Sequence, residues 1–171
     1  MSLQHEIYEV ENINPHWKSK SRIIGRACEL YCCKHIRCIN CNSNDWLECK
    51  INEKSKDQIC NKCNKKYQIK CKSSSEKQIR NIIKNNVFKT LGGEYNTTLR
   101  SIEQDIDYII VLYDKKSNYN ILDIMHISSK YITEKNIIPR KPLSDKARRK
   151  GWQGCSIQFD NFCFINNNFK C

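Results

Sequence analysis

The strongest hydrophobic pattern in the chain is a pair of apolar segments near its middle. DYIIVLYD spans residues 107–114, and YNILDIMHI follows it after the polar sequence KKSN. A short apolar run bounded by turn residues is typical of a buried strand. The two segments therefore predict a β-hairpin in the centre of the fold.

Helical periodicity is clearest in SRIIGRACELYCCKHI, residues 21–36, where Ser21 is a candidate N-cap. The predicted helix places four side chains on one face: Ile24, Cys28, Tyr31 and Cys32. The segment EYNTTLRSIEQD also suits a helix.

The other segments give weaker patterns. We expect residues 1–20 to form a weakly structured arm with a short strand around Ile7–Val10, and the alternating YQIKCK, residues 67–72, to form a strand. SSSEKQIRNIIKNNVFKTLGG predicts a loop or short helix that ends at Gly92–Gly93, and FCFI predicts a further strand. The fold class that follows is α/β (α+β), with a mixed sheet flanked by helices in one domain over residues 1–171.

The net charge and the cysteine content indicate which binding partners and which cellular location to expect. Thirty Lys and Arg against eighteen Asp and Glu give a net charge of +12, which favours a polyanion such as nucleic acid over a merely soluble Lys-rich surface. The chain has no apolar run of about 18 residues and no apolar segment near its start, so we expect neither a membrane span nor a secretory signal. Twelve cysteines without an export signal indicate intracellular thiols with a bound metal, and hence a cytoplasmic location.

Four of the cysteines form two Cys-x-x-Cys pairs. Cys38 and Cys41 make the first pair, Cys60 and Cys63 make the second, and eighteen residues separate the pairs. Two such pairs roughly 15 to 20 residues apart are typical of zinc held by four thiolates, which leave no position for water, so the zinc is structural. The pattern predicts a zinc hairpin over residues 36–66. Reduced core cysteines are the alternative. The other eight cysteines show no ligand spacing, and none stands with a histidine in a recognisable nucleophile motif.

Polar residues flank the second cysteine pair on both arms of this hairpin. Asp57 precedes the pair, and Gln68 and Lys70 follow it. Because strand residues two apart share a face, Gln68 and Lys70 project together, and Asp57 can approach them across the hairpin. An acid, a second oxygen ligand and a lysine are the groups that a Mg²⁺-dependent phosphodiesterase uses. Solvated strand positions are the alternative, because these residue types are common on surfaces.

Three blocks of sequence, in order, carry a family resemblance. The strongest is IIPRKPLSDKARRKGWQGCSI, residues 137–157; the second joins the first cysteine pair to the D-x-x-C-x-x-C block that begins at Asp57 and to the strand with Lys70. The third is Glu29 in the first helix, with an aromatic residue two positions later. Together the blocks resemble the catalytic domain of the DpnI-type restriction endonucleases, which include the Dam-replacing proteins.

The resemblance implies a PD-(D/E)xK nuclease fold with an embedded zinc site. It further implies a type II restriction endonuclease that cleaves double-stranded DNA with Mg²⁺, typically at GATC sites that contain N6-methyladenine. Carried onto this chain, it makes Asp57, Gln68 and Lys70 the catalytic residues, with Asp57 and Gln68 as the magnesium ligands. The zinc ligands are those of the two cysteine pairs.

The chain departs from the family pattern in two respects. Gln68 replaces the usual glutamate, and a neutral amide is a weaker ligand for Mg²⁺ than a carboxylate, although Glu29 or Glu76 could add charge. We also expect no counterpart of the C-terminal winged-helix domain. Two alternatives follow: a catalytically inactive, zinc-stabilised DNA-binding module, or a restriction nuclease that cuts unmodified DNA.

The segment RKPLSDKARRKGW contains the candidate DNA contacts. Arginine can contact phosphates and guanine edges in a bidentate manner, and a tryptophan can stack at a base step or pack in the core. We also expect a short helix over residues 145–150, capped by Ser144. The candidate DNA-binding residues are Arg140, Lys141, Arg148, Arg149 and Trp152.

Overall fold

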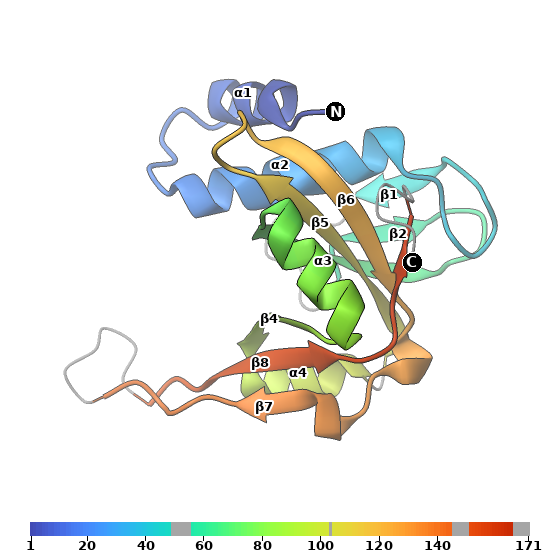
Figure 1. The fold of residues 1–171 in the computed structure, drawn as a ribbon. Coiled ribbons are helices and arrows are strands. Elements are labelled where there is room, and N and C mark those ends of the chain that lie inside the picture. The colour runs from blue at the N-terminus through green and yellow to red at the C-terminus, as the bar shows by residue number, and fades with distance from the viewer. Residues whose placement is uncertain (49–55, 103, 145–150, 166–171) are drawn as a thin grey trace.

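The computed structural model of the chain describes residues 1–48, 56–102, 104–144 and 151–165. Figure 1 shows two β-sheets with helices packed around them. The helices are α1 (Gln4–Ile13), α2 (Lys20–His35), α3 (Glu76–Asn85) and α4 (Tyr95–Ile102), with the 3-10 turns η1 (Ser129–Tyr131) and η2 (Glu134–Asn136). The strands are β1 (Trp46–Glu48), β2 (Gln58–Cys60), β3 (Lys66–Ser73), β4 (Phe88–Glu94), β5 (Ile106–Asp114), β6 (Asn120–Ile127), β7 (Ile137–Pro139), β8 (Gly154–Phe159) and β9 (Cys163–Phe164). Among the described residues, no helix is both long and apolar enough to cross a bilayer.

The larger sheet has the strand order β1-β2-β3-β5-β6-β9. β3 and β5 are parallel, and every other pair in this sheet is antiparallel. Parallel neighbours need a long crossover, which α3, β4 and α4 provide between them. The predicted hairpin of residues 107–127 is confirmed as β5 and β6, and the predicted strand over residues 67–72 is confirmed as β3.

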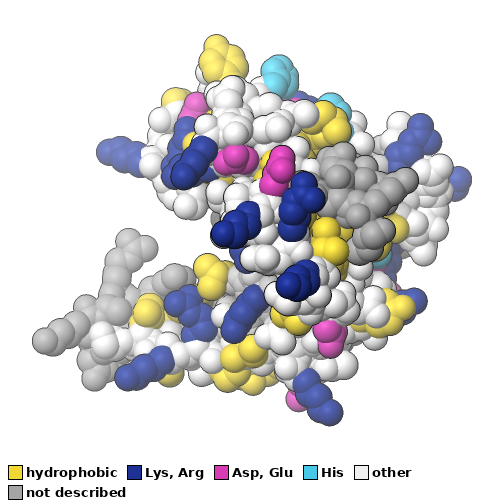
Figure 2. All heavy atoms as spheres, viewed as in Figure 1, with side chains coloured by type: hydrophobic (Ala, Val, Ile, Leu, Met, Phe, Trp, Pro, Cys, Tyr) yellow, Lys and Arg dark blue, Asp and Glu magenta, His cyan; other side chains and the backbone are white. Residues whose placement is uncertain are grey.

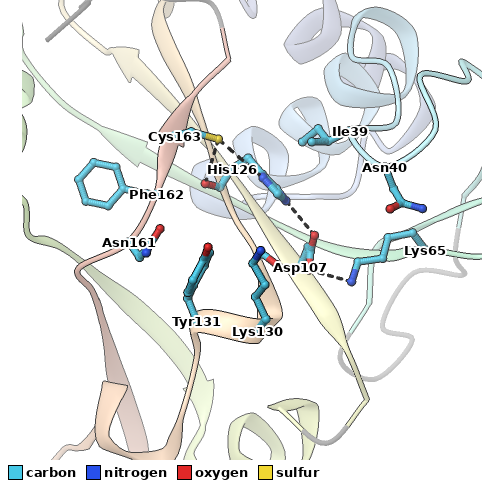
Figure 3. Close-up of a pocket in the computed structure, with 11 residues that line it drawn as sticks. Ile39, Asn40, Lys65, Asp107, His126, Lys130, Tyr131, Asn161, Phe162 and Cys163 are labelled. Carbon is cyan, nitrogen blue, oxygen red and sulfur yellow. Dashed lines mark hydrogen bonds and ion pairs between the residues drawn. The ribbon is translucent and has the colours of Figure 1, made fainter.

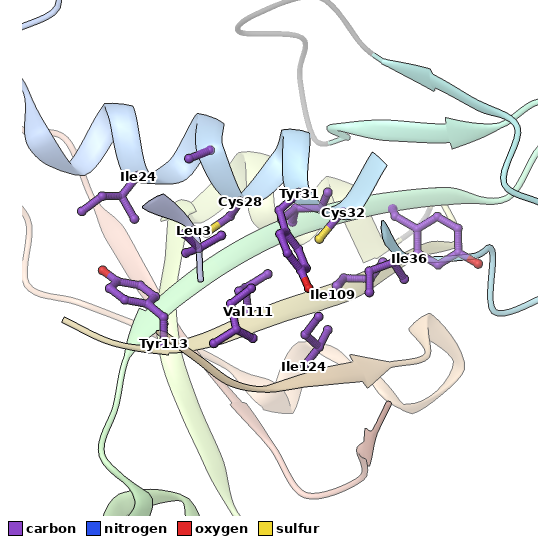
Figure 4. Close-up of a cluster of buried hydrophobic side chains, with 14 of the residues drawn as sticks. Leu3, Ile24, Cys28, Tyr31, Cys32, Ile36, Ile109, Val111, Tyr113 and Ile124 are labelled. Carbon is purple, nitrogen blue, oxygen red and sulfur yellow. The ribbon is translucent and has the colours of Figure 1, made fainter. Parts of the chain in front are cut away.

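The central strand β5 is apolar between Asp107 and Asp114 because it is buried on both faces. Ile109 and Val111 point toward α2 and the N-terminal segment, as Figure 4 shows. Ile110 and Leu112 point to the opposite face, where they pack with Ile79 of α3 and with aromatic side chains of the smaller sheet. The alternation divides the core into two clusters, one on each side of the sheet.

The N-terminal segment is helical, so the predicted arm with a strand around Ile7–Val10 is wrong. Leu3, Ile7 and Val10 recur at helical spacing and are almost fully buried against the sheet. With only three apolar residues, the helical periodicity was too short to recognise from the sequence. The predicted second helix is confirmed as α2, but Ser19 rather than Ser21 caps it, accepting a hydrogen bond from the backbone N–H of Arg22 at 3.4 Å.

The segment after β3 forms a helix and then a strand, rather than a helix that runs to Gly92–Gly93. Ser75 caps α3 in a capping box, and Asn86 ends the helix in the left-handed conformation at φ 49°. Gly92 lies within β4, where a Cβ would come within 2.3 Å of the Sγ atom of Cys155. The glycine therefore allows close approach of two strands and does not end a helix.

The smaller sheet has the order β4-β8-β7, and all its pairs are antiparallel. β7 and β8 come from residues 137–159, and Figure 1 shows α4 beside this sheet and α3 between the two sheets. The helix predicted for EYNTTLRSIEQD, residues 94–105, is confirmed as α4, and FCFI contributes β9. The structure confirms a mixed α+β fold with helices and a four-cysteine hairpin.

Candidate active site and four-cysteine cluster

The two cysteine pairs meet in one cluster. The ligand atoms of Cys38, Cys41, Cys60 and Cys63 all lie within 4.8 Å of one another. Sγ atoms are 3.5 Å apart between Cys38 and Cys63, and also between Cys41 and Cys60. A tetrahedral zinc with Zn–S bonds of about 2.3 Å requires sulfurs roughly 3.8 Å apart. The cluster therefore fits the predicted zinc site, and its donor set is four thiols.

The two pairs share the same backbone turn. The residue after each pair is an asparagine in the left-handed conformation, Asn42 at φ 57° and Asn64 at φ 58°. Each donates its backbone N–H to the carbonyl of the first cysteine, at 2.7 Å to Cys38 and 2.8 Å to Cys60. Asparagine tolerates this conformation better than most residues. The sequence C-x-x-C-N thus folds twice into a turn that directs both thiols to one point.

The cluster is joined directly to the sheet. The Tyr67 hydroxyl of β3 lies 3.4 Å from the Sγ atom of Cys38, and the Trp46 ring packs edge-on against Tyr67 with centroids 5.4 Å apart. Trp46 also donates its indole N–H to the carbonyl of Ile36 at 2.8 Å. The hairpin and the first residues of β3 therefore form one packed unit.

Asp57 lies at the start of β2 and is tied to β3 by two hydrogen bonds. Its backbone N–H donates to Tyr67 at 2.9 Å, and its Oδ2 accepts from the backbone N–H of Ile69 at 2.7 Å. Burial raises the pKa of Asp57, and the Ile69 N–H and the charges of Lys70 and Arg26 offset part of that rise. The carboxylate is thus fixed at the residue between Gln68 and Lys70.

Gln68 and Lys70 share one face of β3. Tyr67 and Ile69 are buried in the cluster beneath α2, so strand alternation turns Gln68 and Lys70, both half-buried, to the other face. The structure therefore brings Asp57 to the strand segment that carries the other two predicted residues.

The helix α2 contributes an ion pair near Asp57. Arg26 and Glu29 are joined at 2.7 Å, and the backbone carbonyl of Glu29 accepts from Gln58 Nε2 at 2.6 Å. Glu76 lies at the start of α3, exposed and 3.8 Å from Arg80. Of the two acids expected to add charge, Glu29 is the one whose helix packs beside β2.

A pocket of about 480 Å³ opens beside Lys70, where β3 faces β4 and β8. It is lined by Lys70, Cys71, Lys72, Ser73, Lys89, Thr90, Leu91 and Ser156. Figure 2 shows a hollow between the part of the molecule that contains the larger sheet and the part that contains the smaller one, with Lys and Arg side chains around it.

Two of the pocket lysines, Lys72 and Lys89, were not predicted as site residues. Lys72 lies over the Phe88 ring, with Nζ 4.8 Å from the centroid, and donates to the Lys89 carbonyl. Burial lowers the pKa of Lys72. The alternation of YQIKCK places Lys72 on the same face as Lys70, and that signal could have identified it.

Three of the five predicted DNA-binding residues lie in the part of the chain that the structure describes. Arg140 and Lys141 are exposed next to the β7–β8 pair, and the Arg140 N–H donates to Gly154 at 2.9 Å. The half-buried Trp152 ring lies over Gly154, where a Cβ would approach it to 2.9 Å. Arg148, Arg149 and the predicted helix over 145–150 lie outside the described residues.

The chain was compared with models of protein families. The model of the DpnI family, described as the Dam-replacing family, matches residues 5–165, which is nearly the whole chain. The match includes the four cysteines, Asp57, the strand β3 and the β7–β8 segment.

Proposed function

Since the chain belongs to the DpnI, Dam-replacing family of restriction-type nucleases, we propose that it is a Mg²⁺-dependent endonuclease that cleaves double-stranded DNA. We further propose the PD-(D/E)xK catalytic arrangement, with Asp57, Gln68 and Lys70 as its residues. The preferred substrate is DNA with N6-methyladenine at sites such as GATC.

One observation carries the proposal: the Asp57 carboxylate is bound to the backbone of Ile69, between Gln68 and Lys70. This bond holds one carboxylate oxygen, and within the described part of the chain the other, Oδ1, accepts no hydrogen bond that competes with a metal. Carboxylate and amide oxygens suit a hard cation such as Mg²⁺. Lys70 lines the adjacent pocket, so its ammonium group is open to a phosphate.

Each residue has a distinct part in this proposal. Asp57 and Gln68 would hold the metal, which when bound polarises the scissile phosphate and acidifies a water. Lys70 stabilises the negative charge that develops on the phosphate oxygens and orients the attacking water. The hydrogen bond from Ile69 keeps Asp57 in place before DNA arrives, so little reorganisation is needed at the reaction step.

The four-cysteine cluster has a structural part in this proposal. With zinc bound by four thiolates, the cluster fixes β2 and β3 together, and these strands carry Asp57 on one side and Gln68 and Lys70 on the other. Burial alone would raise the pKa of Cys63, but hydrogen bonds from the Asn40 side chain and the Lys65 backbone hold it at about 6, which favours the thiolate that zinc requires.

Lysines of the pocket supply DNA affinity. Lys72 and Lys89 line the pocket next to Lys70, and the exposed Arg140 and Lys141 follow β7 in the smaller sheet. A duplex in the hollow between the sheets would meet positive charge on both sides.

The direct test is cleavage of plasmid DNA with and without adenine methylation, in the presence of Mg²⁺. Methyl-directed activity predicts nicked and linear products from the methylated plasmid alone. Equal cutting of both plasmids would support the nuclease for unmodified DNA. No cleavage of either, with DNA binding intact, would refute the enzyme.

The presence of Gln68 favours one other function, an inactive zinc-stabilised DNA-binding module. A carboxamide carries no charge to attract Mg²⁺, so the metal site is weaker than that of an acid pair. The substitution Gln68→Glu separates the two functions. An active nuclease keeps or gains cleavage in this variant at low Mg²⁺ concentration, whereas a binding module remains without cleavage.

A further inference from the structure

A second pocket lies on the face of the large sheet opposite to Gln68 and Lys70. Tyr67 of β3 is paired with Asp107 of β5, and both are one residue out of phase with Gln68, so strand alternation places them on the other face. The pocket has a volume of about 530 Å³ (Figure 3). It is lined from the cysteine hairpin, β5, β6, η1 and β9, and the proposed nuclease chemistry does not involve it.

Three of its side chains form a connected row of nucleophile, base and acid. The Sγ atom of Cys163 lies 3.8 Å from Nδ1 of His126, and Nε2 of His126 lies 2.8 Å from Oδ2 of Asp107. The antiparallel register of β6 and β9 sets His126 directly opposite Cys163, which is why residues far apart in sequence meet. Figure 3 shows Cys163, His126 and Asp107 connected in sequence by dashed lines, with Lys65 on the far side of Asp107.

The acid at the end of the row is held firmly. Oδ1 of Asp107 accepts the Ser129 backbone N–H at 2.8 Å and lies 2.9 Å from the Lys65 ammonium. The Asp107 side chain is only 6% exposed and that of His126 12%, whereas Cys163 is exposed. The imidazole orientation is therefore set by buried contacts, and the thiol at its other nitrogen is open to a reactant.

The electrostatics agree with this geometry. Burial alone would lower the pKa of His126, but Asp107 and Cys163 raise it to about 9. The hydrogen bond and positive charge of His126 lower the pKa of the Cys163 thiol. Both shifts favour a thiolate on Cys163 beside an imidazolium on His126, the state in which a cysteine is nucleophilic.

We propose that Cys163, activated by His126 and oriented through Asp107, is a reactive thiol that undergoes exchange with small-molecule disulfides that enter this pocket. The Cys163 thiolate attacks one sulfur of the disulfide, a new S–S bond forms, and the original S–S bond breaks. The electron pair leaves on the second sulfur, which takes the His126 proton to become a free thiol. Cys163 is oxidised to a mixed disulfide, and half of the reactant is reduced.

The pocket suits a reactant of this class. It is large enough for a short peptide-like disulfide, and Lys130 and Asn161 offer a cation and an amide for its carboxylate and peptide groups. Phe162 and Tyr131 add apolar surface close to the sulfur. These side chains favour an organic disulfide over a peroxide, because a peroxide is too small to contact them.

The test uses zinc-loaded full chain and glutathione disulfide as the probe. The mass gain of the intact protein gives the rate, and peptide mapping gives the modified residue. An ordinary thiol is only about 3% ionised at pH 7, so activation by His126 can raise the thiolate fraction of Cys163 severalfold or more. A less basic thiolate is also a weaker nucleophile, which offsets part of this gain in rate. We therefore expect His126→Gln to slow the reaction about tenfold. The control variant His5→Gln, which changes an exposed histidine of α1, should react as the unchanged protein does.

Several outcomes would overturn the proposal. One is modification that maps to other cysteines, and another is a rate at Cys163 that His126→Gln does not change. Should His126→Gln unfold, the pH profile of the unchanged protein decides. An activated Cys163 gains clearly less than tenfold in rate per pH unit between about pH 6 and 8, whereas an ordinary thiol gains about tenfold per pH unit in this range. Cys163→Ser should block labelling and leave DNA cleavage unaltered, so the result is independent of the nuclease.

Discussion

The buried pair of His126 and Asp107 makes stability depend on pH in a defined window. The pKa of His126 rises from its ordinary 6.5 to about 9 in the folded protein, despite burial, because of Asp107 and Cys163. The folded state therefore binds this proton more tightly than the unfolded state. The resulting stabilisation is fully present below about pH 6.5 and is lost as the pH rises through about 9.

The magnitude follows from the size of the pKa change. Each tenfold gain in proton affinity is about 1.4 kcal/mol, so the rise in pKa from 6.5 to about 9 corresponds to roughly 3 to 3.5 kcal/mol of unfolding free energy. Asp107 has a pKa of about 2, since hydrogen bonds from His126, Ser129 and Lys65 outweigh its burial. Its own contribution is lost only on acidification, well outside the window.

The assay is urea unfolding of zinc-loaded protein at several pH values between about 6 and 9. Cys163 faces the same imidazole and titrates with an opposing slope, so the comparison is made in a Cys163→Ser background. In this background, the unfolding free energy should fall as the pH rises. Adding His126→Gln should abolish most of that fall, whereas adding His5→Gln should leave it unchanged. The reasoning is refuted if His126→Gln declines with pH as steeply as its parent.

Four further predictions concern the nuclease site, DNA affinity, the four-cysteine cluster and the strand packing. Lys70→Ala should abolish cleavage and leave DNA affinity within about threefold in a filter-binding assay, and an equal loss of both would assign Lys70 to phosphate binding. Lys89→Ala should weaken binding and lower the slope of log affinity against log salt by about one, whereas Lys116→Ala, in the β5–β6 turn, should not. Chelation of metal from the four-cysteine cluster should lower the melting temperature and stop cleavage, and zinc should restore both; a chelated protein that melts unchanged would contradict a structural metal. Gly92→Ala should cost about 1 to 3 kcal/mol because its Cβ meets the Cys155 sulfur, and a Cys155→Ala background should remove most of that loss.

The sequence predicted best where a pattern and its physical cause were local. The apolar run at residues 107–114 predicted a buried strand and is β5, and two C-x-x-C-N turns direct their thiols without help from distant residues. The placement of Asp57 beside Gln68 and Lys70 also followed from a hairpin whose two arms lie in register.

Features that depend on tertiary packing were missed. Leu3, Ile7 and Val10 became a helix because they meet a sheet surface, and a polar segment alone gives no sign of that surface. The end of α3 at Asn86 rather than at Gly92–Gly93 reflects a strand pairing with β8. Cys163 and His126 met through a pairing of edge strands, which no spacing of the two residues predicts.

The hairpin places an acid three residues before one thiol pair and a Gln-x-Lys five residues after it, on strands that the four thiols hold in register. If both metals bind as proposed, the affinity for Mg²⁺ depends on bound zinc. Loss of zinc from the four thiols would release the strands that carry the oxygen ligands of Mg²⁺. A cell short of zinc would then keep its magnesium and still lose restriction.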